Sequence, residues 1–98
     1  MLEKEIERKC IRLAKVSHNV ANVKLEGTVG WPDRLFLYAG RVMFIEFKAP
    51  GKLPRPAQVN IHKQLRAIGF TVHIVDSVAE FEILIGNWLE EVKCLSLL

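Results

Sequence analysis

Hydrophobic side chains recur at helical spacing near both ends of the chain. A helix is predicted over residues 2 to 17, with an apolar side formed by Ile6, Cys10, Leu13 and Ser17. A last helix is predicted after Ser77, because Glu80 follows it three residues later as in a capping box. Its apolar side consists of Phe81, Leu84, Ile85, Trp88 and Leu89. No element is assigned from Val92 onward.

Between these helices the pattern changes to strand spacing. Residues 20 to 26 alternate, and the apolar Ala21, Val23 and Leu25 predict a strand whose opposite face is wet. Residues 34 to 39 and 41 to 48 predict two further strands. Only Gly40 and its neighbours separate these two strands, so we expect an antiparallel hairpin. Residues 71 to 75 (TVHIV) predict a fourth strand.

The segment from 49 to 56 (APGKLPRP) has three prolines and a glycine, so it predicts a loop. A helix is expected over residues 57 to 68, with Gly69 as its C-terminal cap and an apolar stripe of Ala57, Ile61, Leu65 and Ile68. This helix is long enough to return the fourth strand parallel to the third. The predicted fold class is α/β with a mixed four-stranded sheet, in the order α-β-β-β-α-β-α.

Length and composition favour a single folded domain over residues 1–98. Half of the residues are hydrophobic and 26% are charged, which argues against disorder. A net charge of +3 permits a nucleic-acid partner without requiring one. Two cysteines are too few for a disulfide scaffold. No apolar run approaches the roughly 20 residues that span a bilayer, and the charged N-terminus is unlike a signal peptide, so we expect a cytoplasmic protein.

One feature of the third strand is unexpected, because Glu46 and Lys48 interrupt an otherwise apolar run. Alternation places both side chains on one face, roughly 6.6 Å apart along the strand at about 3.3 Å per residue. They could form an ordinary ion pair at a strand end, which contributes about 0 to 1 kcal/mol. Taken alone, the two residues favour this interpretation, and a reactive site is the alternative.

Asp33 favours the second interpretation. A hairpin that turns at Gly40 places Asp33 across from about Phe47, near Glu46 on the neighbouring strand. Two close carboxylates repel unless a positive group lies between them, and Mg²⁺ prefers such oxygen ligands. An aspartate after a proline can also simply form a turn. That reading does not explain its position opposite Glu46 and Lys48.

Three other groups could serve the same place. Gln58 lies in the first turn of the helix after the proline-rich loop, where a polar residue is also ordinary. Glu3 lies about 60° from the centre of the first helix's apolar stripe and Glu7 about 100° away, so Glu3 is the better candidate. Alternatively, Glu3 is simply an acidic residue in the first turn of a helix, where the helix dipole favours negative charge. His18, His62 and His73 lack a metal-ligand spacing and are interpreted as ordinary histidines, although His62 follows Gln58 by one turn.

The sequence resembles the VRR-NUC branch of the PD-(D/E)XK nuclease superfamily. The resemblance rests on Pro32-Asp33, on Glu46-Phe47-Lys48, and on the segments GWPDR, IEFKAPGKLPRPAQ and LRAIGFTVHIVDS. Small stand-alone members of this branch occur in phages and prophages. The resemblance covers nearly the whole chain, and it implies a restriction-endonuclease-like core with the order of elements given above.

The resemblance also implies roles for the candidate residues. Asp33, Glu46 and the backbone carbonyl of Phe47 would bind Mg²⁺ or Mn²⁺, and Lys48 would orient or deprotonate the attacking water. Gln58 would steady the site, and Glu3 matches the acidic residue of the first helix. Trp31 stands where a smaller apolar residue is usual. Lys52, Arg55 and Arg34 are candidate contacts to the phosphate backbone of DNA.

Three functions follow as hypotheses. The first is a metal-dependent DNA endonuclease, for which the resemblance implies a homodimer that cuts branched DNA such as Holliday junctions. A two-fold dimer would present two sites to two strands. The second is a nickase or flap nuclease without a junction preference. The third is a catalytically silent nucleic-acid-binding module, against which the intact Asp33, Glu46 and Lys48 argue. A phage-encoded enzyme would act in the host cytoplasm.

Overall fold

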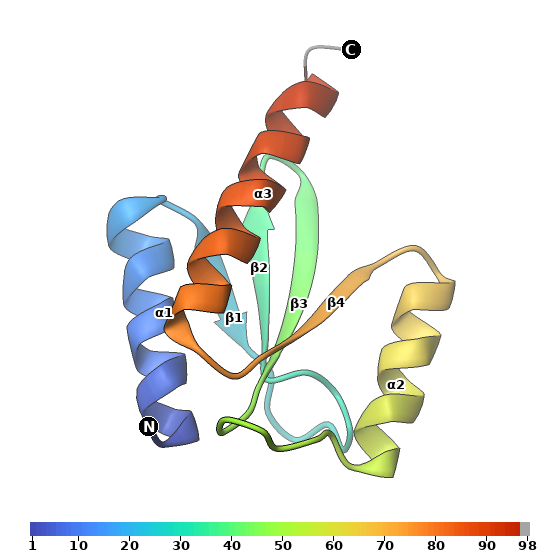
Figure 1. Cartoon of the computed structure of the whole chain (residues 1–98). Helices are drawn as coiled ribbons and strands as arrows, with labels where there is room; N and C mark the ends of the chain where they lie inside the picture. The colour runs from blue at the N-terminus through green and yellow to red at the C-terminus, as the bar shows by residue number, and fades with distance from the viewer. Residues whose placement is uncertain (97–98) are drawn as a thin grey trace.

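A mixed sheet organises the chain in the computed structural model, which describes residues 1–96 (Figure 1). The elements are α1 (Glu3–Ser17), β1 (Ala21–Lys24), β2 (Arg34–Tyr38), β3 (Arg41–Phe47), α2 (Pro56–Ala67), β4 (Thr71–Val75) and α3 (Val78–Ser96). The strands lie in the order β1-β2-β3-β4, and only the β3–β4 pair is parallel. The predicted α/β fold class and element order are therefore confirmed.

The hairpin of β2 and β3 fixes the register on which the candidate site depends. Tyr38 pairs with Arg41, so Ala39 and Gly40 alone form the turn, with φ angles of 48° and 79°. Positive φ at both positions is the signature of the tight turn that matches strand twist. Arg34 pairs with Ile45, which places Asp33 opposite Glu46, one residue from the predicted position opposite Phe47.

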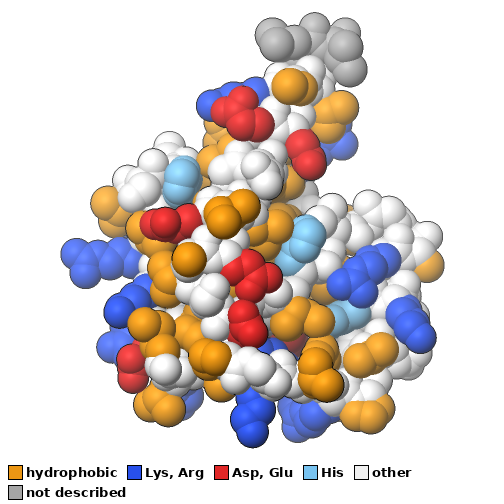
Figure 2. Space-filling model, viewed as in Figure 1, with side chains coloured by type: hydrophobic (Ala, Val, Ile, Leu, Met, Phe, Trp, Pro, Cys, Tyr) orange, Lys and Arg blue, Asp and Glu red, His pale blue; other side chains and the backbone are white. Residues whose placement is uncertain are grey.

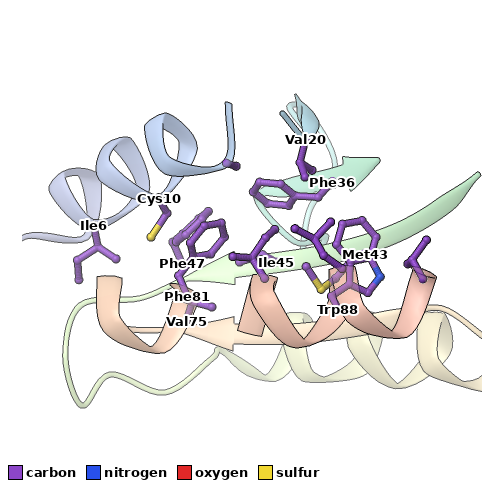
Figure 3. Close-up of a cluster of buried hydrophobic side chains, with 14 residues drawn as sticks. Ile6, Cys10, Val20, Phe36, Met43, Ile45, Phe47, Val75, Phe81 and Trp88 are labelled. Carbon is purple, nitrogen blue, oxygen red and sulfur yellow. The ribbon is translucent and has the colours of Figure 1, made fainter. Parts of the chain in front are cut away.

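The two faces of the sheet are covered by different helices. On one face, α1 and α3 pack over a core that includes Phe36, Met43, Ile45 and Phe47, each fully buried (Figure 3). On the other face, α2 packs over a smaller cluster centred on Phe44, Leu65 and Val72. Alternation along β3 thus sends Met43, Ile45 and Phe47 to the large core, as expected. Glu46, one residue out of phase, points to the α2 side.

The predicted wet face of the first strand is confirmed for Lys24 and Glu26, which are exposed, but the predicted apolar face is not buried. β1 is an edge strand in which Val23 is 46% exposed, whereas Asn22 is half-buried. The side chain of Arg34 donates a hydrogen bond to Oδ1 of Asn22 over 2.9 Å. Asn22 therefore has a partner that compensates for its partial burial, which the hydrophobic pattern could not reveal.

The predicted apolar stripe of the helix before β4 is right for Ile61 and Leu65, which pack in the smaller cluster, and wrong at its two ends. Ala57 is exposed and Ile68 is 71% exposed, whereas the buried residues of α2 are Gln58, His62 and Leu65. The buried side is thus rotated by about one residue, because two polar side chains occupy it. Their partner is a buried carboxylate on β3.

The C-terminal part follows the prediction closely. The backbone N–H of Glu80 donates to Oγ of Ser77 over 3.1 Å, and Phe81 and Ile85 are fully buried. Among residues 1–96, no helix is long and apolar enough to cross a membrane. Cys10 is buried and Cys94 is exposed, and both are free thiols.

Candidate active site

The candidate site forms where β2 begins and β3 ends. Asp33 directly precedes β2, and its Oδ2 accepts a hydrogen bond from the backbone N–H of Phe47 over 2.7 Å. The carboxylate thereby takes the position that a backbone carbonyl would hold if the β2–β3 pairing continued. The Asp33 backbone carbonyl also accepts from the N–H of Leu25 over 2.9 Å. Both contacts fix the aspartate relative to the sheet.

Glu46 is the centre of the site and is only 2% exposed. Its Oε2 accepts a hydrogen bond from Nε2 of Gln58 over 2.9 Å, and Nζ of Lys48 lies 3.7 Å from the same oxygen. Its Oε1 is buried and has no hydrogen-bond partner among the described residues. One side of the carboxylate is therefore held by the protein, and the other side is left for a further ligand.

Burial makes both carboxylates poor anions. The pKa of Glu46 is raised from 4.5 to about 7, chiefly by desolvation and then by the neighbouring Asp33 carboxylate, while the Lys48 charge lowers it. The pKa of Asp33 is also raised by desolvation, against the lowering effect of the Phe47 N–H. Ionising both acids would place more negative charge here than one lysine compensates, and the raised pKa values reflect that cost. Such perturbed acid pairs are typical of functional sites.

Gln58 connects the site to the start of α2. Its Nε2 donates to Glu46, and its Oε1 accepts from the backbone N–H of Arg55 over 2.8 Å. One side chain therefore satisfies a helix-start donor and orients the carboxylate. Pro56, the first residue of α2, has the fixed φ that suits this position. The predicted placement of Gln58 beside the carboxylates agrees with this geometry.

The two acids of α1 have different surroundings. Glu7 is bound to Arg34, whose Nε donates to its Oε2 over 2.7 Å. Glu3 is exposed, and its charge contributes to the raised pKa of Glu46. The Glu3 charge thus reaches Glu46, whereas the Glu7 charge contributes to the raised pKa of Asp33, so both acids of α1 act on the carboxylates of the site. The guanidinium of Arg34, a predicted contact to DNA, instead donates hydrogen bonds to Glu7 and Asn22.

His62 lies beside Glu46 and is not the ordinary histidine that the sequence predicts. It is 1% exposed, and its Nε2 lies 3.8 Å from Oε1 of Glu46. Burial lowers its pKa, and the Arg66 and Lys48 charges lower it further, which favours the neutral ring. The available signal was its spacing of one helical turn from Gln58.

Basic side chains surround the loop that follows β3. Lys52 and Arg55 are exposed in this loop, as expected for contacts to phosphate groups. Figure 2 shows Lys and Arg side chains along the edge of the molecule where this loop and the N-terminus lie in Figure 1. Arg41 starts β3 and therefore lies at the opposite end of that strand from Glu46.

The donor atoms suit a hard divalent cation. Asp33, Glu46 and the Phe47 carbonyl would supply oxygen ligands only, and Glu46 Oε1 is a buried acceptor without a partner. Within residues 1–96, no group of three or more His, Cys, Asp and Glu side chains is arranged to hold a metal. Mg²⁺ does not need three or more protein side chains as ligands, because it keeps several waters and takes phosphate oxygens from a substrate. The residues present therefore fit Mg²⁺ or Mn²⁺ bound together with a phosphate.

Comparisons with known proteins agree with this geometry. No family model matches the chain. The phage protein p44 of Acyrthosiphon pisum secondary endosymbiont phage 1, named as a candidate nuclease, is 46% identical over 52 residues. That match covers 52% of this chain and 56% of the relative, so it spans little more than half of the relative's length.

A solved structure described as a VRR_NUC domain superposes with a TM-score of 0.74 and 26% sequence identity. The alignment covers 86% of this chain and 94% of that structure, so it includes nearly the whole of both. The resemblance to the VRR-NUC domain family that the sequence predicted is confirmed by the fold of the chain.

Proposed function

We propose that the protein is a metal-dependent DNA endonuclease that hydrolyses phosphodiester bonds. The observation that carries this proposal is the half-buried carboxylate of Asp33 next to the buried carboxylate of Glu46, beside the ammonium of Lys48. A buried excess of negative charge costs stability and needs a compensating ligand. Likeness to a VRR_NUC domain and to a phage protein named as a candidate nuclease supports the same function.

Each residue of the site has a distinct task in this proposal. Asp33, Glu46 and the Phe47 carbonyl hold Mg²⁺ or Mn²⁺. When bound, the cation lowers the pKa of a water and stabilises charge on the phosphoryl oxygens. Lys48 orients or deprotonates the attacking water and offsets the charge of the phosphate. Gln58 keeps Glu46 in place, and Glu3 adds negative charge from α1.

Branched DNA is the proposed substrate, and a homodimer is the proposed active form. The protein measures only 38 × 31 × 22 Å, which leaves one chain little surface with which to recognise the shape of a junction. A two-fold dimer would place two sites on two strands, as the paired cuts of a four-way junction require. Lys52 and Arg55 would contact the DNA backbone without reading its sequence.

The experiment compares cleavage of labelled duplex, flap and four-way-junction DNA, with Mg²⁺, with Mn²⁺ and with EDTA. Glu46→Gln is expected to lose more than 100-fold in rate, because it removes a metal-binding charge without changing shape. Glu90→Gln is the matched control, since Glu90 lies on exposed α3 surface and pairs only with Lys93 at 3.6 Å.

The outcomes separate the candidate functions. Paired symmetric cuts confined to the junction would support a resolvase, and cuts in single strands of all substrates would support a nickase or flap nuclease. DNA binding without metal-dependent cleavage would identify a silent binding module and reject the enzyme. Cleavage by Glu46→Gln at the wild-type rate would show that the site lies elsewhere.

A further inference from the structure

A cavity of about 390 Å³ opens beside the carboxylates on the α2 side. The segment from Leu25 to Asp33 forms one wall and the start of α2 forms the other. Asp33 and Gln58 belong to its lining, so it is continuous with the candidate active site. Trp31 and Thr28, which also line the cavity, have no task in the proposed hydrolysis.

The loop wall is held against α2 at a point that admits only glycine. Gly30 has a φ of 82°, and a Cβ there would lie 2.7 Å from the backbone oxygen of Ala57. Pro32, two residues after Gly30, is fully buried. Because the backbones touch at Gly30 and the chain is stiff at Pro32, the loop fixes the side chain between them, Trp31.

Trp31 presents an aromatic surface beside this cavity. Its ring meets that of Phe44 at a centroid distance of 6.1 Å and an angle of 65°, and Phe44 in turn packs edge-on against Phe70. An edge contact leaves aromatic surface uncovered, and Trp31 is 38% exposed. Trp88, the other tryptophan, is only 7% exposed and belongs to the core.

The remaining lining supplies polar groups that match a nucleotide. Arg55 is exposed at the N-terminal cap of α2, and the first turn of this helix contains no acidic residue. Its guanidinium can pair with a phosphate, and the exposed Thr28 offers a hydroxyl. An aromatic face, a cation and a hydrogen-bonding group close together are the usual set for binding one unstacked nucleotide.

We propose that this cavity binds one unpaired nucleotide of the DNA strand, with its base on Trp31 and its phosphate at Arg55. The proposal rests on the proposed nuclease function and adds a source of substrate choice to it. A base inside an intact duplex must first be unstacked, which costs a few kcal/mol. Flaps and gaps already contain such bases, so the proposed nucleotide site favours them over plain duplex.

The test uses tryptophan fluorescence in EDTA, where binding is measured without cleavage. A short oligothymidylate is expected to quench the Trp31 emission, and a duplex of the same length is expected to quench it much less. Trp31→Phe leaves only the buried Trp88 and should abolish the quenching, whereas Trp88→Phe should keep it. Binding of the same labelled oligonucleotide is followed in parallel by anisotropy.

Affinity supplies a second measurement. Trp31→Ala is expected to weaken single-strand binding roughly 5- to 150-fold, the range for losing one stacked base, while Trp31→Phe retains most of it. Arg55→Ala should reduce the salt dependence of binding by about one phosphate contact. Binding by anisotropy without Trp31 quenching, or equal quenching by duplex, would overturn the subsite even if the protein cuts DNA. Quenching without any cleavage would reject the nuclease and leave the nucleotide site standing.

Discussion

Nε2 of His62 faces Oε1 of Glu46 across 3.8 Å in the buried part of the site, and neither atom has a hydrogen-bond partner among residues 1–96. Two facing polar atoms without partners cost stability in a folded protein. Sites that bind a ligand commonly contain polar atoms without partners, because the ligand or a small closing movement compensates for the lost stability. We therefore expect His62 to position Glu46 when the site is loaded.

Substitution of His62 tests this positioning role. His62→Leu is expected to lower the cleavage rate by about 10- to 100-fold, the usual effect of removing a group that orients a metal-binding side chain. His62→Gln can still place an N–H near Glu46 and should retain most of the rate. The melting temperature of His62→Leu without metal should be unchanged or higher, because the variant removes an unsatisfied polar atom. An equal loss of rate in both variants would contradict the role.

Gln58 is expected to matter for stability as well as for activity. Gln58→Ala removes hydrogen bonds to Glu46 and to the backbone of Arg55, which are worth about 1 kcal/mol each. The melting temperature should then fall by about 4–8 °C for each kcal/mol lost. Gln64→Ala, at an exposed position of the same helix, is the control and should leave it nearly unchanged. Similar melting temperatures for the two variants would show that Gln58 does not anchor the site.

The raised pKa of Glu46 predicts how stability without metal depends on pH. Between pH 4.5 and about 7 the folded protein binds this proton and the unfolded chain releases it, so the free energy of unfolding falls as pH rises. Glu46→Gln should remove this contribution and become more stable than the wild type at pH 8. Added Mg²⁺ should stabilise the wild type increasingly above about pH 7, because the proton competes with the cation. Thermal melts of both proteins at pH 5 and pH 8 measure these effects.

The two acids of α1 should respond differently to neutralisation. Glu3→Gln removes a charge that raises the pKa of Glu46, so the pH profile of cleavage should shift toward lower pH. Glu7→Gln instead weakens the partly buried pair with Arg34, so it should lower the melting temperature, and it also removes a charge that raises the pKa of Asp33. A shift of the pH profile by Glu7→Gln and none by Glu3→Gln would reverse this assignment.

Substitution of Gly30 is expected to disturb the loop that forms one wall of the cavity beside Trp31. Both Gly30→Ala and Gly27→Ala place a side chain at positive φ, which costs about 1–2 kcal/mol. Only Gly30→Ala also brings a Cβ to 2.7 Å from the Ala57 oxygen, whereas no atom lies within 4 Å of a Cβ at Gly27. Gly30→Ala should therefore lower the melting temperature by several degrees more and weaken oligonucleotide binding. Equal effects of both variants would show that the close contact is unimportant.

Much of the fold could be predicted because its signals are local. Alternation marked β2 and β3, Gly40 marked their turn, and Ser77 with Glu80 marked the start of α3. The hairpin register then placed Asp33 within one residue of its observed partner, which was enough to bring the two carboxylates together.

The buried face of α2 could not be predicted in the same way. Gln58 and His62 are polar, and a hydrophobic pattern assigns such residues to solvent. They are buried because Glu46 is buried, so their position depends on a partner that is distant in the sequence. The same reason applies to Asn22, whose partial burial follows from its contact with Arg34.

The hydrogen bond from the Phe47 N–H to the Asp33 carboxylate has a consequence for how activity arises during folding. The bond exists only when β2 and β3 are paired in their native register, since a slip by one residue would move Glu46 to the other face of the sheet. A newly made or partly folded chain therefore has no assembled carboxylate pair. For the proposed nuclease, competence to cut would then appear only together with the native sheet.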